Sequence, residues 1–309
     1  MGAADKWIAE ANCDTPTGEV AGRALAARLG RVLHTLPLAA HLAYEDIEHV
    51  HAARVATRRA GAALRMYADF MPERPRKRMR KMLKGIRDSM GEARDLDVYL
   101  ERLANDTDQA SRELIARLER QRRLRQSDII RAAMPLLLEE KLRNRVGKLI
   151  RKSEKHAVRK LRQRPFGEWA TERLAHEWQA MVAGVPGDNP GAAELHEFRI
   201  VTKQFRYALE LLGGGLPSKL RKSLYPQVKR LQARLGEIQD HAVAAEKLAA
   251  WQSGAGSKRE RRLLEKLEGE ERKRYEGKTV AFAHWWRHDR IDELAATLKS
   301  PTSPPEDGC

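Results

Sequence analysis

One pattern of basic residues occurs twice in this chain, and His196 in the second copy lies 145 positions after His51 in the first. The copies read HVHAARVATRRAGAALRMYADFMP at 49–72 and LHEFRIVTKQFRYALELLGGGLP at 195–217. Without a gap, the alignment pairs His51 with His196, Arg54 with Arg199, Arg58 with Lys203, Lys77 with Lys222 and Lys84 with Lys229. The register continues to GEARDLDV at 91–98 and GEIQDHAV at 236–243. A repeat of this length predicts a fold made of two similar halves.

The first copy predicts an amphipathic helix with a face that carries no acid. On a wheel of about 100° per residue, His51, Arg54 and Arg58 lie within about 60° of one another, and Arg65 falls in the same sector. The opposite side is apolar and is formed by Ala53, Ala56, Ala60, Ala63, Leu64, Tyr67, Phe70 and Met71. Solvated faces usually mix acids with bases, because like charges four residues apart repel. The basic face is therefore either an unusual solvated surface or a contact for an anion.

The next predicted helix repeats this distribution of charge. Within about 80° of one another on its wheel lie Lys77, Arg80, Lys84 and Arg87. The second half keeps the two lysines as Lys222 and Lys229. Tyr225 and Gln232 replace the two arginines, so the second half has the weaker basic face.

The fold class predicted from the periodicity is all-α. Nearly every segment between glycine- or proline-rich stretches is amphipathic with helical spacing, and none shows the sustained alternation of a strand. The predicted helices of the first half span 19–43, 45–71, 76–90, 94–104, 108–133 and 136–161. Those of the second half span 166–183, 191–212, 218–235, 240–252, 257–277 and 279–298. We interpret GEARD as a helix boundary, with Gly91 ending one helix and Asp95 capping or pairing near the start of the next.

The predicted organisation is a short N-terminal extension at 1–18, one repeated domain at 19–298 and a disordered tail at 299–309. The two halves of the domain cover about 19–160 and 161–298, each as a bundle of helices. Duplicated bundles can pack with pseudo-twofold symmetry, which would bring the two basic faces to one groove or pore.

The composition favours a polyanionic partner. The 309 residues carry a formal net charge of +16, which suits nucleic acid, an anionic membrane surface or polyphosphate. The two cysteines, Cys13 and Cys309, imply no disulfide framework, and a reducing compartment is expected. The chain shows no apolar run as long as a signal peptide or a membrane span, so we expect a cytoplasmic protein that does not enter membranes.

The residues of the repeat resemble the CHAD family, the conserved histidine α-helical domain. The resemblance rests on HAARVATRRAGAALR, HEFRIVTKQFRYALE and the GEARDLDV and GEIQDHAV segments, and it covers about residues 20–290. It implies two helical bundles related by pseudo-twofold symmetry, binding of inorganic polyphosphate in a basic central cavity, and association with polyphosphate granules. Gly61 departs from the family, which usually has a basic residue at that position.

The resemblance carries the cavity of the family over to His51, Arg54, Arg58, Arg59, Lys84, Arg94, His196, Arg199, Lys203, Arg206 and Lys229. The basic faces add Arg65, Lys77, Arg80, Arg87 and Lys222 to the predicted polyphosphate-binding residues. Linear polyphosphate needs many cations and no stacking surface, which agrees with an aromatic content of only 6%.

Two other classes of function stay open from the sequence. A nucleic-acid-binding protein is allowed by the net charge, although no DNA- or RNA-binding motif is evident. A phosphohydrolase would need metal-binding carboxylates, and the nearest resemblance to a triphosphatase motif is EGEER, with Glu268, Glu270 and Arg272, in a predicted helix rather than a strand. We expect no catalytic residues and no cofactor.

Two further motifs are interpreted structurally. Glu48 and His51 have the spacing of a di-iron ligand pair, but Ala193 stands where the repeat would place the second glutamate, so we expect no metal site. HWWRH at 284–288 is expected to belong to the core rather than to an aromatic contact surface.

Overall fold

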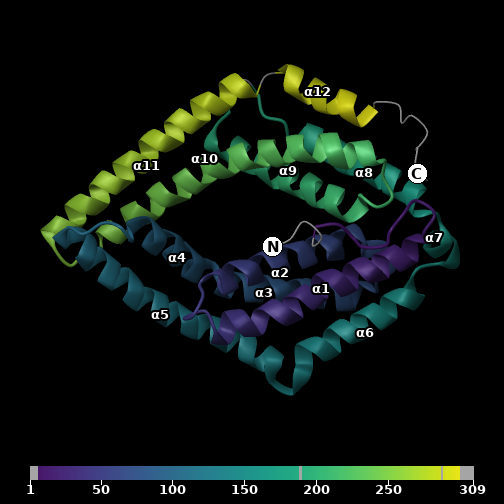
Figure 1. Cartoon of the computed structure of the whole chain (residues 1–309), viewed down its shortest axis with the longest axis horizontal. Coiled ribbons are helices and arrows are strands. Elements are labelled where there is room, and N and C mark those ends of the chain that lie inside the picture. Colours follow the sequence, from purple (N-terminus) through teal and green to yellow (C-terminus); the bar gives the residue numbers. More distant parts are fainter. Residues whose placement is uncertain (1–5, 188–189, 287, 300–309) are drawn as a thin grey trace. The chain divides into compact units, whose positions relative to one another are not determined.

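The computed structural model describes residues 6–187, 190–286 and 288–299, and within these ranges it is helical and contains no strand. The all-α prediction is confirmed. The first helices are α1 (Thr17–His41), α2 (Glu48–Met66), α3 (Glu73–Ser89), α4 (Gly91–Leu103), α5 (Gln109–Leu137), α6 (Lys141–His156) and α7 (Arg159–Gln163) (Figure 1). The later helices are α8 (Phe166–Ala183), α9 (Ala192–Leu212), the π-helical turn η4 (Leu220–Leu224), α10 (Tyr225–Gln252), α11 (Lys258–Trp285) and α12 (His288–Lys299). Short 3₁₀ turns follow α2 at Ala68–Phe70 and α5 at Leu138–Glu140.

The helices form two compact units. The N-terminal unit comprises Thr15–Phe166, and the C-terminal unit comprises the described residues of 1–14 and 167–309. In the N-terminal unit, α1 packs against α2, α5 and α6, while α2 packs against α3. Alanines on α2 make its contact with α1 close: Ala53 and Ala60 are both buried. The spacing that predicted the apolar side of this helix is thus the spacing of its core contacts.

A buried polar network also ties the helices of the N-terminal unit together. Arg122 on α5 donates from Nε to Asp97 Oδ1 on α4 over 2.5 Å, and both side chains are almost completely buried. Gln126, one turn further along α5, donates from Nε2 to the carbonyl oxygens of Ala39 and Ala40 at 3.0 and 2.8 Å. These bonds give partners to buried polar atoms of all three side chains, although Asp97 Oδ2 accepts no hydrogen bond from a described residue.

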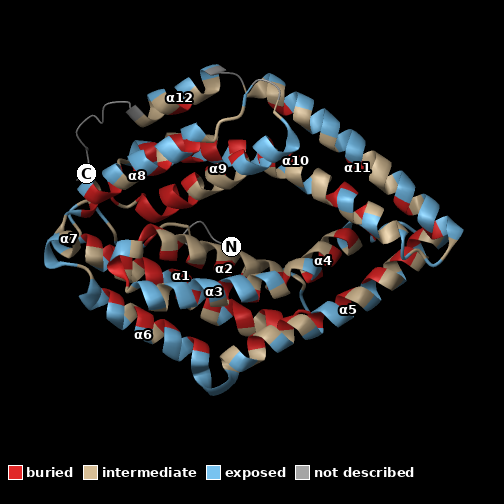
Figure 2. Ribbon diagram, turned by 180° about the vertical axis from the view of Figure 1, so that it is seen from behind, coloured by how far each residue is buried: buried red, intermediate tan, exposed pale blue. Residues whose placement is uncertain are grey.

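In the C-terminal unit, α10 packs against both α9 and α11. Phe198 and Phe205 of α9 are completely buried, and Phe205 meets Trp178 of α8 with ring centroids 5.5 Å apart. Figure 2 shows the result: α9 carries many buried residues, whereas α11 is mostly exposed or half-buried. The core of this unit is therefore centred on α9 and α10, and α11 covers one side of α10.

Two of the three glycines after α9 permit a close approach of the N-terminal segment. A Cβ on Gly213 would lie 2.7 Å from ring carbons of Trp7, and one on Gly214 would lie 2.5 Å from the carbonyl oxygen of Ala11. Trp7 also packs on Tyr225 at the start of α10, with ring centroids 5.0 Å apart. The GGGLP segment was predicted only as a helix stop, and α9 does end at Leu212.

The predicted break between helices at 218–235 and 240–252 is wrong, because α10 runs without interruption from Tyr225 to Gln252. Gly236 lies inside this helix, where a glycine costs only about 1 kcal/mol relative to alanine. Contacts with α11 flank Gly236 on both sides, since Arg234 lies over Trp285 and Glu237 pairs with Lys278. Tertiary packing has overridden the local preference.

Three other predicted boundaries need correction. Gly91 does not end a helix: Met90 separates α3 from α4, Gly91 is the first residue of α4, and Asp95 lies inside α4 rather than at its cap. The break predicted near 278 falls instead at Trp286, whose N–H donates to the carbonyl oxygen of Phe282 over 2.6 Å. The single helix predicted at 136–161 is divided into α6 and α7 by an extended backbone at Ala157.

Candidate functional site: two basic helix faces

The basic face of α2 lies opposite its buried alanines. Five predicted site residues on this helix are all half-buried: His51, Arg54, Arg58, Arg59 and Arg65. The structure brings Arg94 of α4 and Arg87 of α3 close to this face, since both affect the titration of Arg54. We call His51, Arg54, Arg58, Arg87 and Arg94 the α2 cluster.

Arg54 connects three helices at the centre of the α2 cluster. Its Nη1 donates to the carbonyl oxygen of Arg87 over 3.0 Å, in the last turn of α3. The same atom lies 3.5 Å from the position that a Cβ on Gly91 would occupy. A cation at a helix C-terminus satisfies free carbonyl groups and interacts favourably with the helix dipole. Arg54 therefore stabilises the end of α3 as well as adding charge to the cluster.

Burial lowers the pKa of Arg54, and the neighbouring cations Arg58, Arg87 and Arg94 act in the same direction. The carboxylate of Asp95 opposes them. A guanidinium keeps its proton at physiological pH in spite of such a shift. Three cations and one acid therefore act on the titration of Arg54, in addition to its burial.

Cations of the α2 cluster also act on the pKa of His51. Burial lowers its pKa below the usual value of 6.5, Arg94 and Arg58 lower it further, and Glu48 partly opposes them. Glu48 also forms an ion pair with Arg94, with 3.3 Å between Oε1 and Nη1. The Glu48 and His51 pair considered as a metal motif thus has a different partner, a cation. Among the described residues, no group of three or more potential metal ligands comes together.

Among the arginines of the α2 cluster, Arg58 differs from the others because no described residue forms a hydrogen bond or an ion pair with it. Its Nε atom is buried, yet neither this atom nor the rest of the guanidinium forms a hydrogen bond or an ion pair with a described residue. A buried donor without an acceptor costs about 1–3 kcal/mol, and more for a charged group. An anion bound at this position would remove that cost.

The predicted cations of α3 are more exposed and are partly compensated. Lys77 pairs with Glu73 over 2.6 Å, and Lys84 pairs with Asp88 over 3.3 Å. Arg87 lies 3.8 Å from the other oxygen of Asp88. Arg80 is exposed and has no ion pair with a described residue. Exposed pairs of this kind are weak, so these lysines remain available to a strong anion.

In the C-terminal unit, the counterparts of His51 and Arg94 are also in contact. His196 lies within 2.6 Å of Gln239 on α10, measured from Nδ1 to Oε1, so the imidazole N–H donates to the amide oxygen. In the register of the repeat, Gln239 corresponds to Arg94. The same two positions are therefore neighbours in each unit, but only the N-terminal unit has a cation at the second position.

Arg206 differs from the other predicted site residues because an acid compensates its charge. Its side chain is 13% exposed and donates to Glu210 on the same helix and to Gln232 on α10. Tyr225 donates to the same carboxylate over 2.9 Å. Burial alone would lower the pKa of Arg206, but Glu210, Tyr207 and Tyr225 together outweigh burial and raise the pKa. This network was missed from the sequence, although the spacing of Arg206 and Glu210 is that of a helical ion pair.

The remaining predicted cations of the C-terminal unit lie on α9, η4 and α10. Arg199 is half-buried and makes no hydrogen bond or ion pair with a described residue. Lys203 is also half-buried on α9, while Lys222 on η4 and Lys229 on α10 are exposed. We call His196, Arg199, Lys203 and Lys229 the α9 cluster. It has fewer arginines than the α2 cluster and no helix end for Arg199 to cap.

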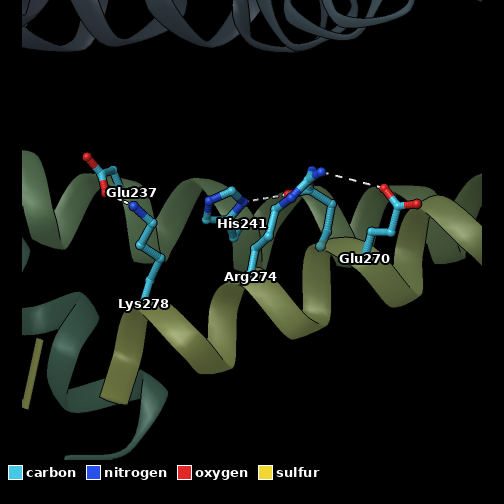
Figure 3. Close-up of polar contacts among 6 residues, drawn as sticks. Glu237, His241, Glu270, Arg274 and Lys278 are labelled. Atoms are coloured by element: carbon cyan, nitrogen blue, oxygen red, sulfur yellow. Dashed lines mark hydrogen bonds and ion pairs between the residues drawn. The ribbon is translucent and has the colours of Figure 1, made fainter. Parts of the chain in front are cut away.

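Several charged residues of α10 and α11 are paired with one another. Lys278 meets Glu237 over 2.7 Å, and Arg274 lies 3.5 Å from Glu270 (Figure 3). His241 also contacts an acid, since its Nδ1 is 2.6 Å from Oε2 of the buried Glu271. Glu268 of the EGEER motif pairs with Arg272 over 2.5 Å and accepts from Gln252. These carboxylates hold α11 against α10 or pair along α11.

The HWWRH segment forms an aromatic cluster at the end of α11. Trp286 packs on Phe198 with ring centroids 5.1 Å apart, and Trp285 lies beneath Arg234 and Arg290 at 4.5 and 5.0 Å. Both tryptophans are half-buried. The expectation that they belong to the core is therefore met only in part. The side chain of His288 lies outside the described part of the chain.

Comparison with known proteins gives a family and a fold. The model of the CHAD domain family matches residues 5–249. The crystal structure of the CHAD domain from the plant Ricinus communis has 22% identity, covers 95% of each chain and gives a TM-score of 0.67. PptA from Streptomyces chartreusis has 19% identity, covers 88% of this chain and 99% of its own, and gives a TM-score of 0.61. None of the curated proteins matches this chain.

None of the described helices is both long enough and apolar enough to cross a bilayer.

Proposed function

Because this chain belongs to the CHAD domain family, we propose that it binds inorganic polyphosphate, a known property of that family, through the α2 and α9 clusters. The observation that carries the proposal is Arg58. Its half-buried guanidinium faces the same side of α2 as His51 and Arg54 and has no acceptor among the described residues. The phosphate oxygens of a bound chain would supply that acceptor.

The chemistry of the clusters suits a ligand that has dense negative charge and no bases. Arginine grips phosphate oxygens with two parallel donors, and lysine adds a mobile point charge. Recognition of single-stranded nucleic acid also relies on aromatic side chains that stack on bases. The helix faces that carry the α2 and α9 clusters have none, because Tyr67 and Phe205 on the same segments are buried in the cores.

The finer part of the proposal concerns how the ligand is used. Both basic faces contribute to one cavity and contact a single polyphosphate chain, as the repeat in the sequence suggests. The protein binds this chain without hydrolysing it, and in cells it resides at polyphosphate granules in the cytoplasm. The equal spacing of the clusters in the two copies of the repeat supports the shared cavity, and the absence of a metal-binding motif in the sequence supports binding without hydrolysis. The location at granules is proposed from the resemblance to the CHAD family alone.

Binding is tested by calorimetric titration of the full chain with long-chain polyphosphate and with duplex DNA at equal phosphate concentration and physiological salt. We expect polyphosphate to bind much more tightly. A salt series should show the affinity falling steeply as salt rises, because bound cations release the counterions of the phosphate chain. Equal affinity for duplex DNA would overturn the proposal in favour of a nucleic-acid-binding protein.

Turnover is tested separately by incubating the protein and long-chain polyphosphate with magnesium or manganese. We expect the length of polyphosphate on gels and the concentration of free phosphate to stay constant. Shortening of the chain that grows with protein concentration would instead identify a phosphohydrolase.

A further inference from the structure

A second basic site lies in the N-terminal unit, on a different face of α3 from the predicted polyphosphate residues. It is a groove of about 570 Å³ between α3 and α6. Its walls are Pro75, Arg78, Met79, Lys81 and Met82 from α3, and Arg145, Lys148, Leu149 and Lys152 from α6. Neither the α2 cluster nor any other cation of the polyphosphate proposal contributes to it.

The floor of the groove is apolar. Met79 and Leu149 are buried at its base, and Met82 is half-buried beside them. Arg145 reaches over from α6, with its Nη1 3.5 Å from the sulfur of Met82. The thioether and aliphatic side chains offer a surface that adapts to an elongated apolar group. The groove contains no aromatic ring and no side-chain carboxylate or amide oxygen.

The rim of the groove carries five cations that no acid compensates. All five are exposed, and none forms an ion pair with a described carboxylate: Arg78, Lys81, Arg145, Lys148 and Lys152. This differs from the neighbouring Lys77, which pairs with Glu73 on the same helix. Lys148 and Lys152 are four residues apart on α6, a spacing at which like charges repel. An anion seated between the helices would relieve this repulsion.

We propose that this groove binds a single-chain anionic amphiphile, with its head group held by the rim cations and its aliphatic chain on the methionine and leucine floor. A nucleotide fits less well, because the lining has no acceptor for the amino groups of a base. Polyphosphate has no apolar part and gains nothing from the floor. The volume falls in the range of small-molecule pockets, about 300–1,000 Å³, so the occupant is a monomeric molecule rather than a bilayer.

The proposal is tested with dodecyl phosphate below its micelle concentration, titrated calorimetrically into the full chain. We expect it to bind at least about tenfold more tightly than butyl phosphate, because each buried methylene adds to the free energy of transfer. The double variant Lys148→Glu with Lys152→Glu should weaken binding by about tenfold or more. The matched control, Arg120→Glu with Arg123→Glu on α5, makes the same change of charge at exposed residues outside the groove and should cost much less.

The floor is tested with Met82→Gln, which keeps the charge and nearly the size of the side chain. It should weaken dodecyl phosphate binding several-fold and leave inorganic tripolyphosphate binding unchanged. Equal binding of butyl and dodecyl phosphate, or equal losses in the lysine variant and its control, would overturn the proposal. Binding only to phosphatidylcholine vesicles that contain phosphatidic acid, with none of monomeric dodecyl phosphate, would do the same. These outcomes do not depend on whether the α2 cluster binds polyphosphate.

Discussion

The α2 and α9 clusters begin from the same sequence pattern but place their central arginine differently. Arg54 caps the end of α3 through the carbonyl oxygen of Arg87. Arg199, its counterpart, has no helix end to cap, because α10 continues past the equivalent point at Leu235. One arginine is therefore held by the fold, whereas the other is free to follow a ligand. Equal positions in a repeat need not have equal roles.

The two units also differ in how much of their charge is compensated. Arg206 stands where the N-terminal unit has Gly61, so the second unit has an extra cation at this position. Glu210 neutralises that cation and stands where the first unit has Arg65. The number of cations in the C-terminal unit therefore overstates how much this unit contributes to anion binding. The α2 cluster should dominate the affinity.

The largest effect is expected from Arg206→Ala. It leaves the carboxylate of Glu210 buried without its cation, and breaking a buried pair in this way typically costs about 3–5 kcal/mol. Polyphosphate affinity should change by no more than about twofold, because the charge of Arg206 is already compensated. Denaturant unfolding and calorimetric titration measure the two quantities.

Arg199→Ala is the matched variant two turns away on the same helix. It should behave in the opposite way, with weaker binding and nearly unchanged unfolding. A tenfold loss of affinity in Arg206→Ala with no loss of stability would show that Arg206 contacts the ligand and that the two units are more alike than their ion pairs suggest.

The next largest effect separates Arg54 from Arg199. Charge-assisted hydrogen bonds contribute about 1.5–3 kcal/mol, so Arg54→Glu and Arg199→Glu should each weaken polyphosphate binding tenfold or more. Only Arg54→Glu should also lower the free energy of unfolding, because the carbonyl of Arg87 at the end of α3 loses its charged donor and keeps only the N–H of Met90. Thermal unfolding and titration of both variants measure this difference.

Reversing the charges of Arg120 and Arg123 together tests whether polyphosphate affinity depends on where the cations lie or only on the net charge of the protein. These residues are exposed on α5, and the double variant changes the net charge by more than either single variant. Charges more than about 8 Å from the ligand are largely screened at physiological salt, so this control should lose less affinity. If affinity followed net charge alone, the assignment of the clusters would be wrong.

The smallest effect is a pH dependence that His51 contributes. Its pKa is lowered in the free protein, so as pH falls below 6.5 the unfolded chain takes up this proton first and His51 disfavours the folded state. A bound phosphate favours the imidazolium and raises the pKa, so polyphosphate binding should take up a proton. The affinity should then rise by a few-fold between about pH 7.5 and about pH 5.5.

His51→Gln should flatten that dependence while leaving the affinity at about pH 7.5 within about twofold of the parent. Titrations at several pH values in both proteins measure the difference. An identical pH profile in the two proteins would show that other groups take up the proton. His196→Gln is the comparison variant and should have the smaller effect, because its neighbour is Gln239 rather than a cation.

The sequence predicted most helices closely where a breaker coincided with the end of an apolar pattern. The helix at 166–183 matches α8, and the helix at 191–212 starts one residue before α9. Three of the wrong boundaries lie at or next to single glycines, Gly91, Gly236 and Gly277, and the fourth lies at Ala157. A glycine in a helix is a small local cost, and only the neighbouring helices decide whether the helix continues across it.

For the candidate site, the sequence identified the cations but not their partners. The face of α2 with His51, Arg54 and Arg58 follows from helical spacing alone, because side chains three and four residues apart share one side of a helix. The contact of Arg54 with Arg87 and that of His196 with Gln239 join residues far apart in the chain. No periodicity within one helix specifies such contacts.

The sequence by itself determined that the protein is helical, that its basic pattern is repeated, and which side of each repeated helix is apolar. These properties depend on short-range spacing, and the hydrophobic effect then buries the apolar side. Only the tertiary structure decided which cations stay uncompensated, as Arg58 does, and which are neutralised, as Arg206 is. It also formed the groove between α3 and α6 from two separately amphipathic segments. Compensation depends on distances of a few ångströms between helices, and these distances are set by the packing of whole side chains in the core.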